Sequence, residues 1–291
     1  MTNNLAKILT IGMPTHNGAR TIGKSILSLL NQTERRFQLV ISDNASNDGT
    51  EEICRNLAKG DERIIYIRQR VNLGPIGNFN YVLDYAESDY FMWACDDDAW
   101  DQCFVEKLIK ILNSSSEWSF SIPSWHVRSR RFPGVRRVNL PSLDFISDLD
   151  PEVRVWKFTS LPHTSFKDNM TFGVWRTEAL KAIMHSAKDN IKYYSIGGPL
   201  NEYTLGKVRG VQLNEYLFSK YYKTFPPGHF LEKVILFLKK TPMLGWKIPF
   251  AREYPRYTFQ EFSDDIRWGL LKADFDERFI KRVIEINRAY W

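Results

Sequence analysis

Three consecutive aspartates, Asp96, Asp97 and Asp98, directly follow the apolar run YFMWAC at positions 90–95. Because adjacent like charges repel one another, three acids at the end of a predicted strand call for a nearby cation or for exposure to water. If the strand continued through position 98, Asp96 and Asp98 would share one face and Asp97 would point to the other. Two co-facial carboxylates suit Mg²⁺ or Mn²⁺, which prefer oxygen ligands and are often held by carboxylates plus substrate phosphates. The alternative is a solvated turn in which Asp98 or Asp101 caps the next helix.

Three other predicted strands also end in polar segments that are rich in Gly, Asn and Asp. These segments are PTHNGAR at 14–20, DNASNDGT at 43–50 and QRVNLGPIGN at 69–78. In an open parallel sheet, ligands bind beyond the carboxyl ends of the strands, near the point where the strand order reverses. We therefore expect the three segments and the aspartate triplet to meet at one edge of a sheet and to bind a nucleotide or a metal there.

The polar segments offer groups that could contact a nucleotide. Asp43 could accept the imide N–H of a pyrimidine base, although it also suits the turn that follows it. Thr15 and the backbone around it could face a base or a ribose, next to the free N-terminus of the following helix. Asn17 could equally be a plain N-cap. The second segment does not fit a calcium loop, because Arg55 takes the place of the final Glu, and the chain contains no phosphate loop.

Strands and helices alternate over the first hundred residues. Apolar runs predict strands at 7–13, 37–42, 63–68 and 90–95, and helical spacing of apolar residues predicts helices at 19–33, 49–60, 77–88 and 102–115. This alternation is typical of an α/β protein whose parallel sheet carries helices on both faces.

The pattern changes after about residue 116. The later elements that we predict are a strand at 118–127, a strand feeding a helix within 171–184, a short helix at 201–208, and helices at 229–240, 258–272 and 275–290. The segment 128–138 has no acids, and its Pro-Gly pair predicts a basic hairpin or loop with Arg128, Arg130, Arg131, Arg136 and Arg137.

The composition is that of a globular protein. The chain has 291 residues, of which 43% are hydrophobic, a formal net charge of +6 and a pI of about 9.1. This length and hydrophobicity support a large core and exclude an intrinsically disordered chain. The mild basicity suits a phosphate-bearing ligand or an anionic membrane surface, and it is also common in proteins that bind neither.

The cysteines and the apolar runs indicate in which cellular compartment the protein is expected. Cys54, Cys95 and Cys103 are odd in number and lack metal-knuckle spacing, which favours a reducing compartment. We find no signal peptide and no run of about 18 apolar residues. We therefore expect a cytoplasmic protein, either in solution or at the inner face of the membrane. There, the helix within 229–240 could lie on the lipid surface or pack on the rest of the protein.

Four segments together resemble family 2 glycosyltransferases of the GT-A fold: MPTHNGARTIGKSILSLLNQT, VISDNASNDGT, VNLGPIGNFNYVLDYAESDYFMWACDDDAW and the later NEYTLGKV. The resemblance is dense over 7–110 and thinner to about 210. It implies a mostly parallel, twisted sheet with helices on both faces, followed by a helical extension. We accordingly expect a catalytic domain at 1–219, with a nucleotide-sugar-binding half at 1–115 and an acceptor half at 116–219. A basic, aromatic extension at 220–291 would follow.

The resemblance also implies roles for the strand exits. Asp98, together with Asp96, would bind a Mn²⁺ or Mg²⁺ ion on the diphosphate of a nucleotide-sugar donor. The residues that would hold the nucleotide are Pro14, Thr15, Asn17, Asp43, Asn72, Gly74, Asn78, Asp96 and Asp97. His16 and Asn44 depart from the family, which commonly has Tyr and a second acid at these positions, so the identity of the base stays open.

An inverting transferase needs a general base that takes the proton of the acceptor hydroxyl. The family supplies it as the second acid of a Glu-Asp pair that opens a short helix, and this chain has Asn201 and Glu202 there. We therefore expect Glu202 to be the base, with Asp168 as a reserve candidate. The alternative is that Glu202 is a first-turn acid favoured by the helix dipole.

The acceptor half offers Trp175 and Arg176 where the family places acceptor-side contacts. Aromatic side chains suit sugar faces, although a Trp in an apolar strand is more often part of the core. The arginines of 128–138 could meet an anionic lipid-linked acceptor, or they could form a solvated hairpin.

The expected function is transfer of a sugar from a nucleotide-sugar, which we expect to be linked to UDP, to a hydroxyl of a glycan or lipid-linked acceptor. One alternative is a sugar nucleotidyltransferase, whose Gly-rich, Arg-containing first loop is missing here. Another is an inactive nucleotide- or glycan-binding relative, which Asn201 favours. We expect no nucleic-acid partner.

Overall fold

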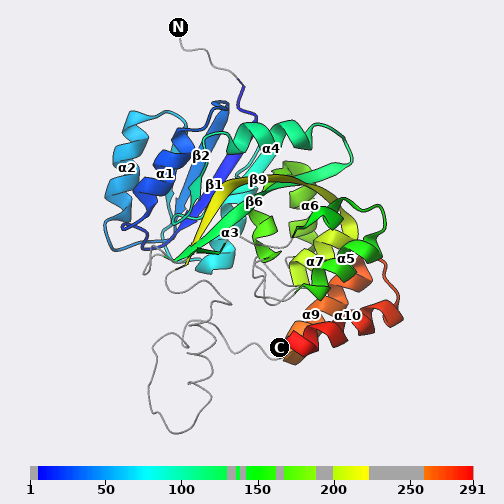
Figure 1. The fold of residues 1–291 in the computed structure, drawn as a ribbon. Helices are drawn as coiled ribbons and strands as arrows, with labels where there is room; N and C mark the ends of the chain where they lie inside the picture. The colour runs from blue at the N-terminus through cyan, green and yellow to red at the C-terminus, as the bar shows by residue number, and fades with distance from the viewer. Residues whose placement is uncertain are drawn as a thin grey trace.

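The computed structural model describes residues 6–129, 136–137, 142–161, 167–187, 199–222 and 259–290 (Figure 1). The elements of the first part are β1 (Leu9–Thr15), α1 (Ile22–Leu30), β2 (Phe37–Asp43), α2 (Thr50–Gly60), β3 (Ile64–Arg68), α3 (Gly74–Asp84), β4 (Tyr90–Trp93), β5 (Ala99–Trp100) and α4 (Phe104–Leu112). Those of the second part are β6 (Trp118–Ser129), β7 (Arg136–Arg137), η1 (Asp144–Ser147), α5 (Pro151–Ser160), η3 (Lys167–Phe172), β8 (Val174–Arg176), α6 (Thr177–Ala187), α7 (Pro199–Lys207), β9 (Arg209–Tyr222), α9 (Phe259–Lys272) and α10 (Glu277–Tyr290).

The first four strands form a parallel sheet in the order β3-β2-β1-β4. Connections between parallel strands are right-handed. The chain moves outward from β1 to β3 and then returns past β1 to β4, so α1 and α2 lie on one face of the sheet and α3 lies on the other. The contact of α1 with α2, and of α3 with β1 and β2, agrees with this arrangement.

The second part of the sheet adds short antiparallel pairs to the mostly parallel sheet that was expected. From β4 the order continues as β8-β6-β9-β5, with β7 paired to β6. In the part of the chain that the structure describes, β8 is antiparallel to both β4 and β6, and β5 is antiparallel to β9. Strands β6 and β9, in contrast, pair in parallel over a long ladder with register shifts near Pro123.

The residue patterns explain these elements. All seven residues of β1 are buried, as expected for a strand that helices cover on both faces. Helix α4 buries a stripe of apolar side chains and exposes the opposite face, which is the pattern of a helix packed on a core. The stripe consists of Phe104, Val105, Leu108, Ile109 and Leu112.

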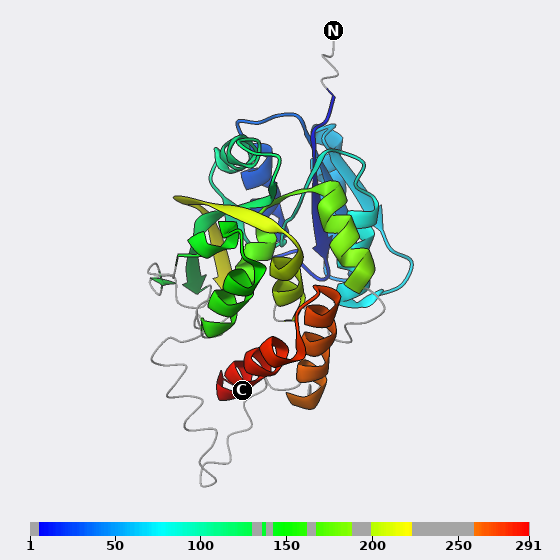
Figure 2. The ribbon, with the colours of Figure 1, turned by 90° about the vertical axis from the view of Figure 1, so that its right-hand side faces the viewer.

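The last two helices pack on the rest of the protein. Trp268 of α9 lies against Tyr203 of α7, with ring centroids 5.6 Å apart. Phe279 of α10 lies 6.5 Å from the Trp156 ring of α5, and Figure 2 shows both helices below α5 and α7. Strand β9 crosses the expected boundary at 219/220 and ends at Tyr222.

The strands of the first hundred residues, the helix of 201–208 and the helices of 258–272 and 275–290 are confirmed within a few residues, and β7 pairs with β6 as a hairpin. The helix at 229–240 and residues Arg130 and Arg131 lie outside the described residues. Helix α5 and strand β9 were not predicted. No helix in the described ranges has both the length and the hydrophobicity that crossing a bilayer requires.

Substitution of Gly173, which precedes β8, tests its packing against β6, and substitution of Gly23 in α1 is the control. A Cβ atom at Gly173 would lie 2.2 Å from the backbone oxygen of Ser121, so we expect Gly173→Ala to lower the free energy of unfolding by about 1–3 kcal/mol. A Cβ at Gly23, in α1, would make an ordinary 3.7 Å contact with Ile53. Gly23→Ala should therefore raise the free energy of unfolding by about 0.5–1 kcal/mol. Urea unfolding of both variants measures the free energy of unfolding. Equal values for the two variants would contradict the close approach of Gly173 to Ser121.

Candidate active site

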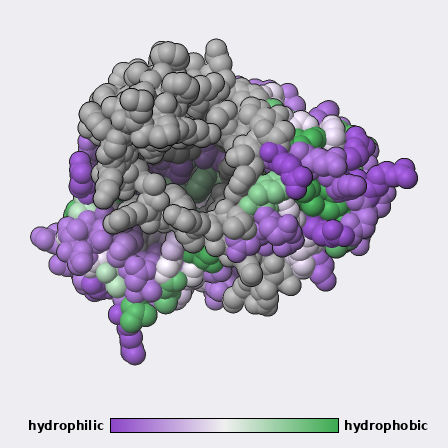
Figure 3. Space-filling model, turned by 90° about the horizontal axis from the view of Figure 1, so that it is seen from below, coloured by the Kyte–Doolittle hydropathy of each residue, from purple (hydrophilic) through white to green (hydrophobic). Residues whose placement is uncertain are grey.

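The carboxyl ends of β1, β2 and β4 meet at one edge of the sheet, as the polar segments predicted. Thr15 and Asp43 are register partners at the ends of β1 and β2, and the backbone N–H of Asn44 donates to the carbonyl of Thr15 at 2.9 Å. The strand β1 points downward in Figure 2, so Figure 3 views this edge of the molecule from below. Described residues of both hydrophilic and hydrophobic character are visible on this side of the molecule.

Asp43 is buried and held by three donors. Its Oδ1 accepts the backbone N–H of Ser46 at 2.8 Å, and its Oδ2 accepts the hydroxyl of Tyr66 at 2.6 Å and the guanidinium of Arg68 at 3.1 Å. Burial, and then the hydrogen bond to Asp43, raises the pKa of Tyr66, so the phenol stays protonated and donates. These donors fix the orientation of the carboxylate at the end of β2.

An amide network joins the first three strand exits. Asn44 donates from Nδ2 to Oδ1 of Asn72 at 2.8 Å, and its Oδ1 accepts the backbone N–H of Leu73 at 2.7 Å. The backbone N–H of Gly74 donates to the same Asn72 oxygen. Nδ1 of His16 lies 2.9 Å from the carbonyl oxygen of Asn44 and must carry the proton, because a carbonyl only accepts. The two departures from the family, His16 and Asn44, therefore contact each other.

Asn17 and Asn78 connect segments of this edge. Asn17 has a left-handed backbone, with φ of 55°, and its Oδ1 accepts the backbone N–H of Asn47. It is not the N-cap of α1, because Thr21 takes that position. Asn78 is buried, and its side-chain amide makes two hydrogen bonds with Ser42 near the end of β2: Oδ1 accepts the Ser42 hydroxyl, and Nδ2 donates to the Ser42 carbonyl. Pro14 lies buried within β1. Asn78 and Pro14 thus shape the site from inside the fold.

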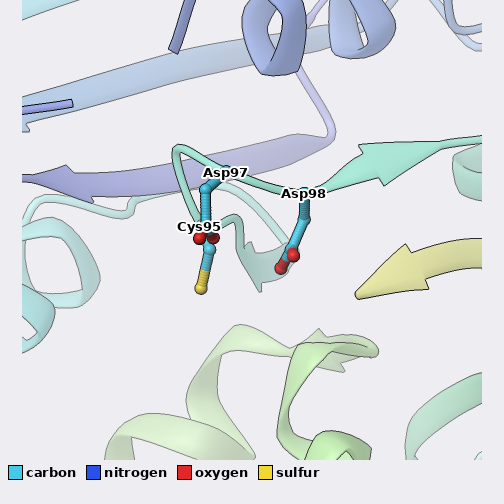
Figure 4. A group of neighbouring side chains, drawn as sticks. All are labelled: Cys95, Asp97 and Asp98. Carbon is cyan, nitrogen blue, oxygen red and sulfur yellow. The ribbon is translucent and has the colours of Figure 1, made fainter. Parts of the chain in front are cut away.

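The aspartate triplet does not continue the strand. β4 ends at Trp93 and a turn follows at 96–97, so the expectation that Asp96 and Asp98 share a face is wrong. Asp96 instead accepts the hydroxyl of Thr15. The groups that come together are Cys95, Asp97 and Asp98, where the cysteine sulfur and one carboxylate oxygen of each aspartate lie within 4.8 Å of one another (Figure 4).

Asp98 forms a buried ion pair with Lys220 of β9. The Lys220 Nζ donates to Asp98 Oδ2 at 2.7 Å, and the backbone N–H of Tyr221 donates to Oδ1 at 3.0 Å. Burial raises the pKa of Asp98 to about 6, although Lys220 opposes this rise. Burial acts against the charge of Lys220, but Asp98 and its neighbours raise the lysine pKa overall. Both groups are therefore charged at pH 7.

The donor atoms of this group suit a hard divalent cation. Burial raises the pKa of the Cys95 thiol, so the sulfur is a neutral and weak ligand. Two carboxylates remain, which is the number that often holds Mg²⁺ or Mn²⁺ together with substrate phosphates. Asp97 and Asp98 would hold such an ion, and Cys95 would lie beside it.

Glu202 lies inside the protein, between α7 and two other helices. It is 2% exposed, and its Oε1 accepts the hydroxyl of Thr159 in α5 at 2.8 Å and the amide of Asn287 in α10 at 3.1 Å. The neighbouring Asn201 accepts the hydroxyl of Thr171 in η3. The role of Glu202 as a base stays a prediction, and the side chain of Asp168 lies outside the described residues.

Trp175 and Arg176 have structural contacts. Trp175 is 2% exposed, stacks on Phe120 at 4.3 Å and donates to the carbonyl of Thr171. The guanidinium of Arg176 donates to the carbonyls of Trp118, Leu112 and Ser115. Trp175 therefore lies in the core and Arg176 binds backbone carbonyls, and the acceptor-side role of both residues stays a prediction.

The sequence analysis missed the partners of the acids. Tyr66 and Arg68 are two apart on β3, and that spacing places them on one face, so the strand pattern could have found them. Lys220 could have been found only by recognising LFSKYY at 217–222 as part of a strand. Thr159 and Asn287 carry no local signal, since they reach Glu202 through tertiary packing.

Residues 10–141 match the family described as glycosyl transferase family 2. Over 91 residues the chain is 36% identical to a GalNAc(5)-diNAcBac-PP-undecaprenol beta-1,3-glucosyltransferase of Campylobacter jejuni, covering 31% of this chain and 29% of that protein. Over 105 residues it is 32% identical to the Escherichia coli UDP-Glc:alpha-D-GlcNAc-diphosphoundecaprenol beta-1,3-glucosyltransferase WfgD, covering 36% and 41%. The chain thus spans less than half the length of these two relatives.

Solved structures share the fold. TarS residues 1–349 of S. aureus in complex with UDP-GlcNAc superpose with a TM-score of 0.59 at 14% identity, covering 95% of this chain and 70% of that one. The mannosyltransferase PcManGT of Pyrobaculum calidifontis, in complex with GDP-Man and Mn²⁺, gives a TM-score of 0.53 at 11% identity, covering 97% and 69%. At this identity the likeness shows the GT-A fold alone.

The hydrogen bond from α10 to Glu202 can be tested by stability. We expect Asn287→Ala to lower the free energy of unfolding by about 1–3 kcal/mol, because it leaves a buried carboxylate oxygen with one donor fewer. Glu285 lies on the exposed face of the same helix, so Glu285→Ala should change it by less than about 0.5 kcal/mol. Equal effects of the two substitutions in urea unfolding would show that α10 does not support Glu202.

Proposed function

Residues 10–141 of this chain belong to glycosyl transferase family 2, and from this premise we propose that the chain is an inverting, divalent-metal-dependent glycosyltransferase. It transfers a sugar from a nucleotide-sugar donor, UDP-linked in our proposal, to a hydroxyl of a glycan or lipid-linked acceptor. The observation that carries the proposal is the convergence of four polar strand exits, all within the matched segment, at one edge of the sheet.

The donor side follows from that edge. We assign the base and ribose to the region of Asp43, Asn17 and the network of His16, Asn44 and Asn72, where hydrogen-bonding groups from three exits lie together. The diphosphate belongs near Asp97 and Asp98, which would hold a Mn²⁺ or Mg²⁺ ion. Such an ion would neutralise charge on the departing nucleoside diphosphate.

The acceptor side is proposed from the relatives and from one exposed surface. Both relatives described above are named for undecaprenol-linked acceptors. In this chain Val71, Leu73 and Ile76 expose apolar side chains next to the nucleotide network, by 64%, 42% and 39%. Exposed apolar side chains in one segment suit the prenyl part of a lipid-linked acceptor. Glu202 remains our proposed general base, and contact with the membrane surface is part of the same proposal.

The burial of Glu202 favours a second candidate, an inactive relative that binds the nucleotide without transfer. Its carboxylate is 2% exposed and bonded to two other helices, whereas a base must reach the acceptor hydroxyl within about 3.2 Å. In this case nucleotide binding would persist, and a nucleotide-sugar would not be consumed.

Donor binding is tested by thermal unfolding with UDP, GDP and their sugars, each with and without Mn²⁺. We expect UDP with Mn²⁺ to stabilise the protein by about 2.7 kcal/mol when free UDP is a hundred times its Kd. Asp98→Asn should abolish the Mn²⁺-dependent part of this effect, and Asp101→Asn, an exposed acid three residues away, should keep it. If Asp98→Asn retained the full Mn²⁺ effect, the metal assignment would be wrong.

Transfer is tested with a UDP-sugar and a short-chain polyprenyl-diphosphate GlcNAc as acceptor. We expect Glu202→Gln to keep the affinity for UDP and to lower kcat by about 10²–10⁴-fold, because general-base catalysis is lost. Glu178→Gln, at an exposed acid in the first turn of α6, is the matched control. Full activity of Glu202→Gln would place the base elsewhere, and a wild-type protein that binds UDP without turnover would support the inactive relative.

A further inference from the structure

A lysine ammonium lies inside the group of acids that would hold the metal. Lys220 Nζ is 2.7 Å from Asp98 Oδ2 and 3.1 Å from the Cys95 sulfur, and it lies 4.0 Å from the centre of the Phe172 ring. The Asp98 side chain is fully buried, and that of Lys220 is 12% exposed. This contact is therefore a built part of the site and not a surface ion pair.

The register of the sheet places Lys220 opposite Asp98. In the antiparallel pair of β5 and β9, Ala99 lies opposite Ser219 and Trp100 lies opposite Phe218. One step further along the same register, Asp98 faces Lys220. The rings of Trp100 and Phe218 stack at 5.7 Å and support this register. The pairing of β5 with β9 thus positions the Lys220 ammonium next to the Asp98 carboxylate.

Lys220 occupies the oxygen that a metal would use. Each oxygen of Asp98 already accepts a hydrogen bond, Oδ2 from Lys220 and Oδ1 from the backbone of Tyr221. A divalent ion on this carboxylate would lie beside the ammonium at a buried oxygen, where like charges repel more strongly than in water. The ammonium and the metal therefore exclude each other at Asp98.

We propose that Lys220 is a displaceable counter-ion, which neutralises Asp98 in the metal-free protein and passes to the donor diphosphate when a divalent cation takes Asp98. This inference rests on the proposed function for the identity of the diphosphate. A lysine ammonium is a compact charge on a flexible stem and binds phosphate oxygens well. The incoming cation and the diphosphate of a nucleotide-sugar carry opposite charges of equal size, so the exchange leaves the net charge of the site unchanged.

The first experiment measures the affinity for Mn²⁺ alone, without nucleotide, by titration calorimetry at pH 8. We expect Lys220→Gln, which can still donate a hydrogen bond to Asp98, to bind Mn²⁺ at least ten times more tightly than the wild type. Lys107→Gln removes an exposed ion pair with Glu215 of the same strand and should leave the affinity unchanged. Equal or weaker Mn²⁺ binding by Lys220→Gln overturns the exclusion.

The second experiment follows Lys220 in the wild-type protein, so it does not depend on the folding of a variant. An amine-reactive reagent and peptide mapping report the accessibility of Lys220 and of Lys107 as a reference. We expect Mn²⁺ to increase labelling of Lys220 several-fold without changing Lys107, and UDP added with Mn²⁺ to protect Lys220 again. Unchanged labelling of Lys220 on addition of Mn²⁺ overturns its displacement.

The third measurement separates this inference from the proposed function. With saturating Mn²⁺, Lys220→Gln should bind UDP at least ten times more weakly than the wild type, and unchanged UDP affinity overturns the passage of Lys220 to the diphosphate. If no nucleotide binds to the wild type, the proposed function fails, whereas the Mn²⁺ titration and the labelling with Mn²⁺ alone still decide the exclusion at Asp98.

Discussion

The need to pair every buried carboxylate organises this protein. Asp43, Asp98 and Glu202 are all almost completely buried, and an ionised carboxylate without partners is costly in a protein interior. Each draws its partners from another element: Asp43 from β3, Asp98 from β9, and Glu202 from α5 and α10. The acids that the proposed chemistry needs are therefore also the points at which distant parts of the chain are joined.

These pairs connect the two parts of the sheet to the last helices. The bond between Asp98 and Lys220 links the exit of β4 to β9, which is the far side of the mixed sheet. Phe172 of η3 lies against Lys220, and its neighbour Thr171 contacts Asn201 at the start of α7. A continuous chain of contacts thus runs from the proposed metal site to the helix that carries the proposed base.

The sequence predicts the local features of this arrangement well and the long-range ones poorly. The four strand exits and the positions of Asp43 and Asp98 follow from apolar runs that end in polar residues. This pattern is local, since each instance spans about ten residues. The turn at Asp96 and Asp97 was missed because an apolar run does not show where hydrogen bonding of the strand stops. Lys220 and Asn287 lie 122 and 85 residues from the acids they bind, and no local pattern encodes such pairing.

The Asp98–Lys220 pair is a poor choice if stability alone is considered. Desolvating two charges costs several kcal/mol per ion, and buried pairs can often be replaced by apolar residues with no loss of stability. A site that must later receive a dication and a diphosphate has a different requirement, since it needs ionised oxygens that are already in position. An internal ammonium keeps Asp98 ionised at neutral pH without a metal, and strand pairing holds it where an incoming cation can replace it. We therefore interpret the pair as a means of keeping Asp98 ionised and ready to bind a cation, and not as a contribution to the stability of the fold.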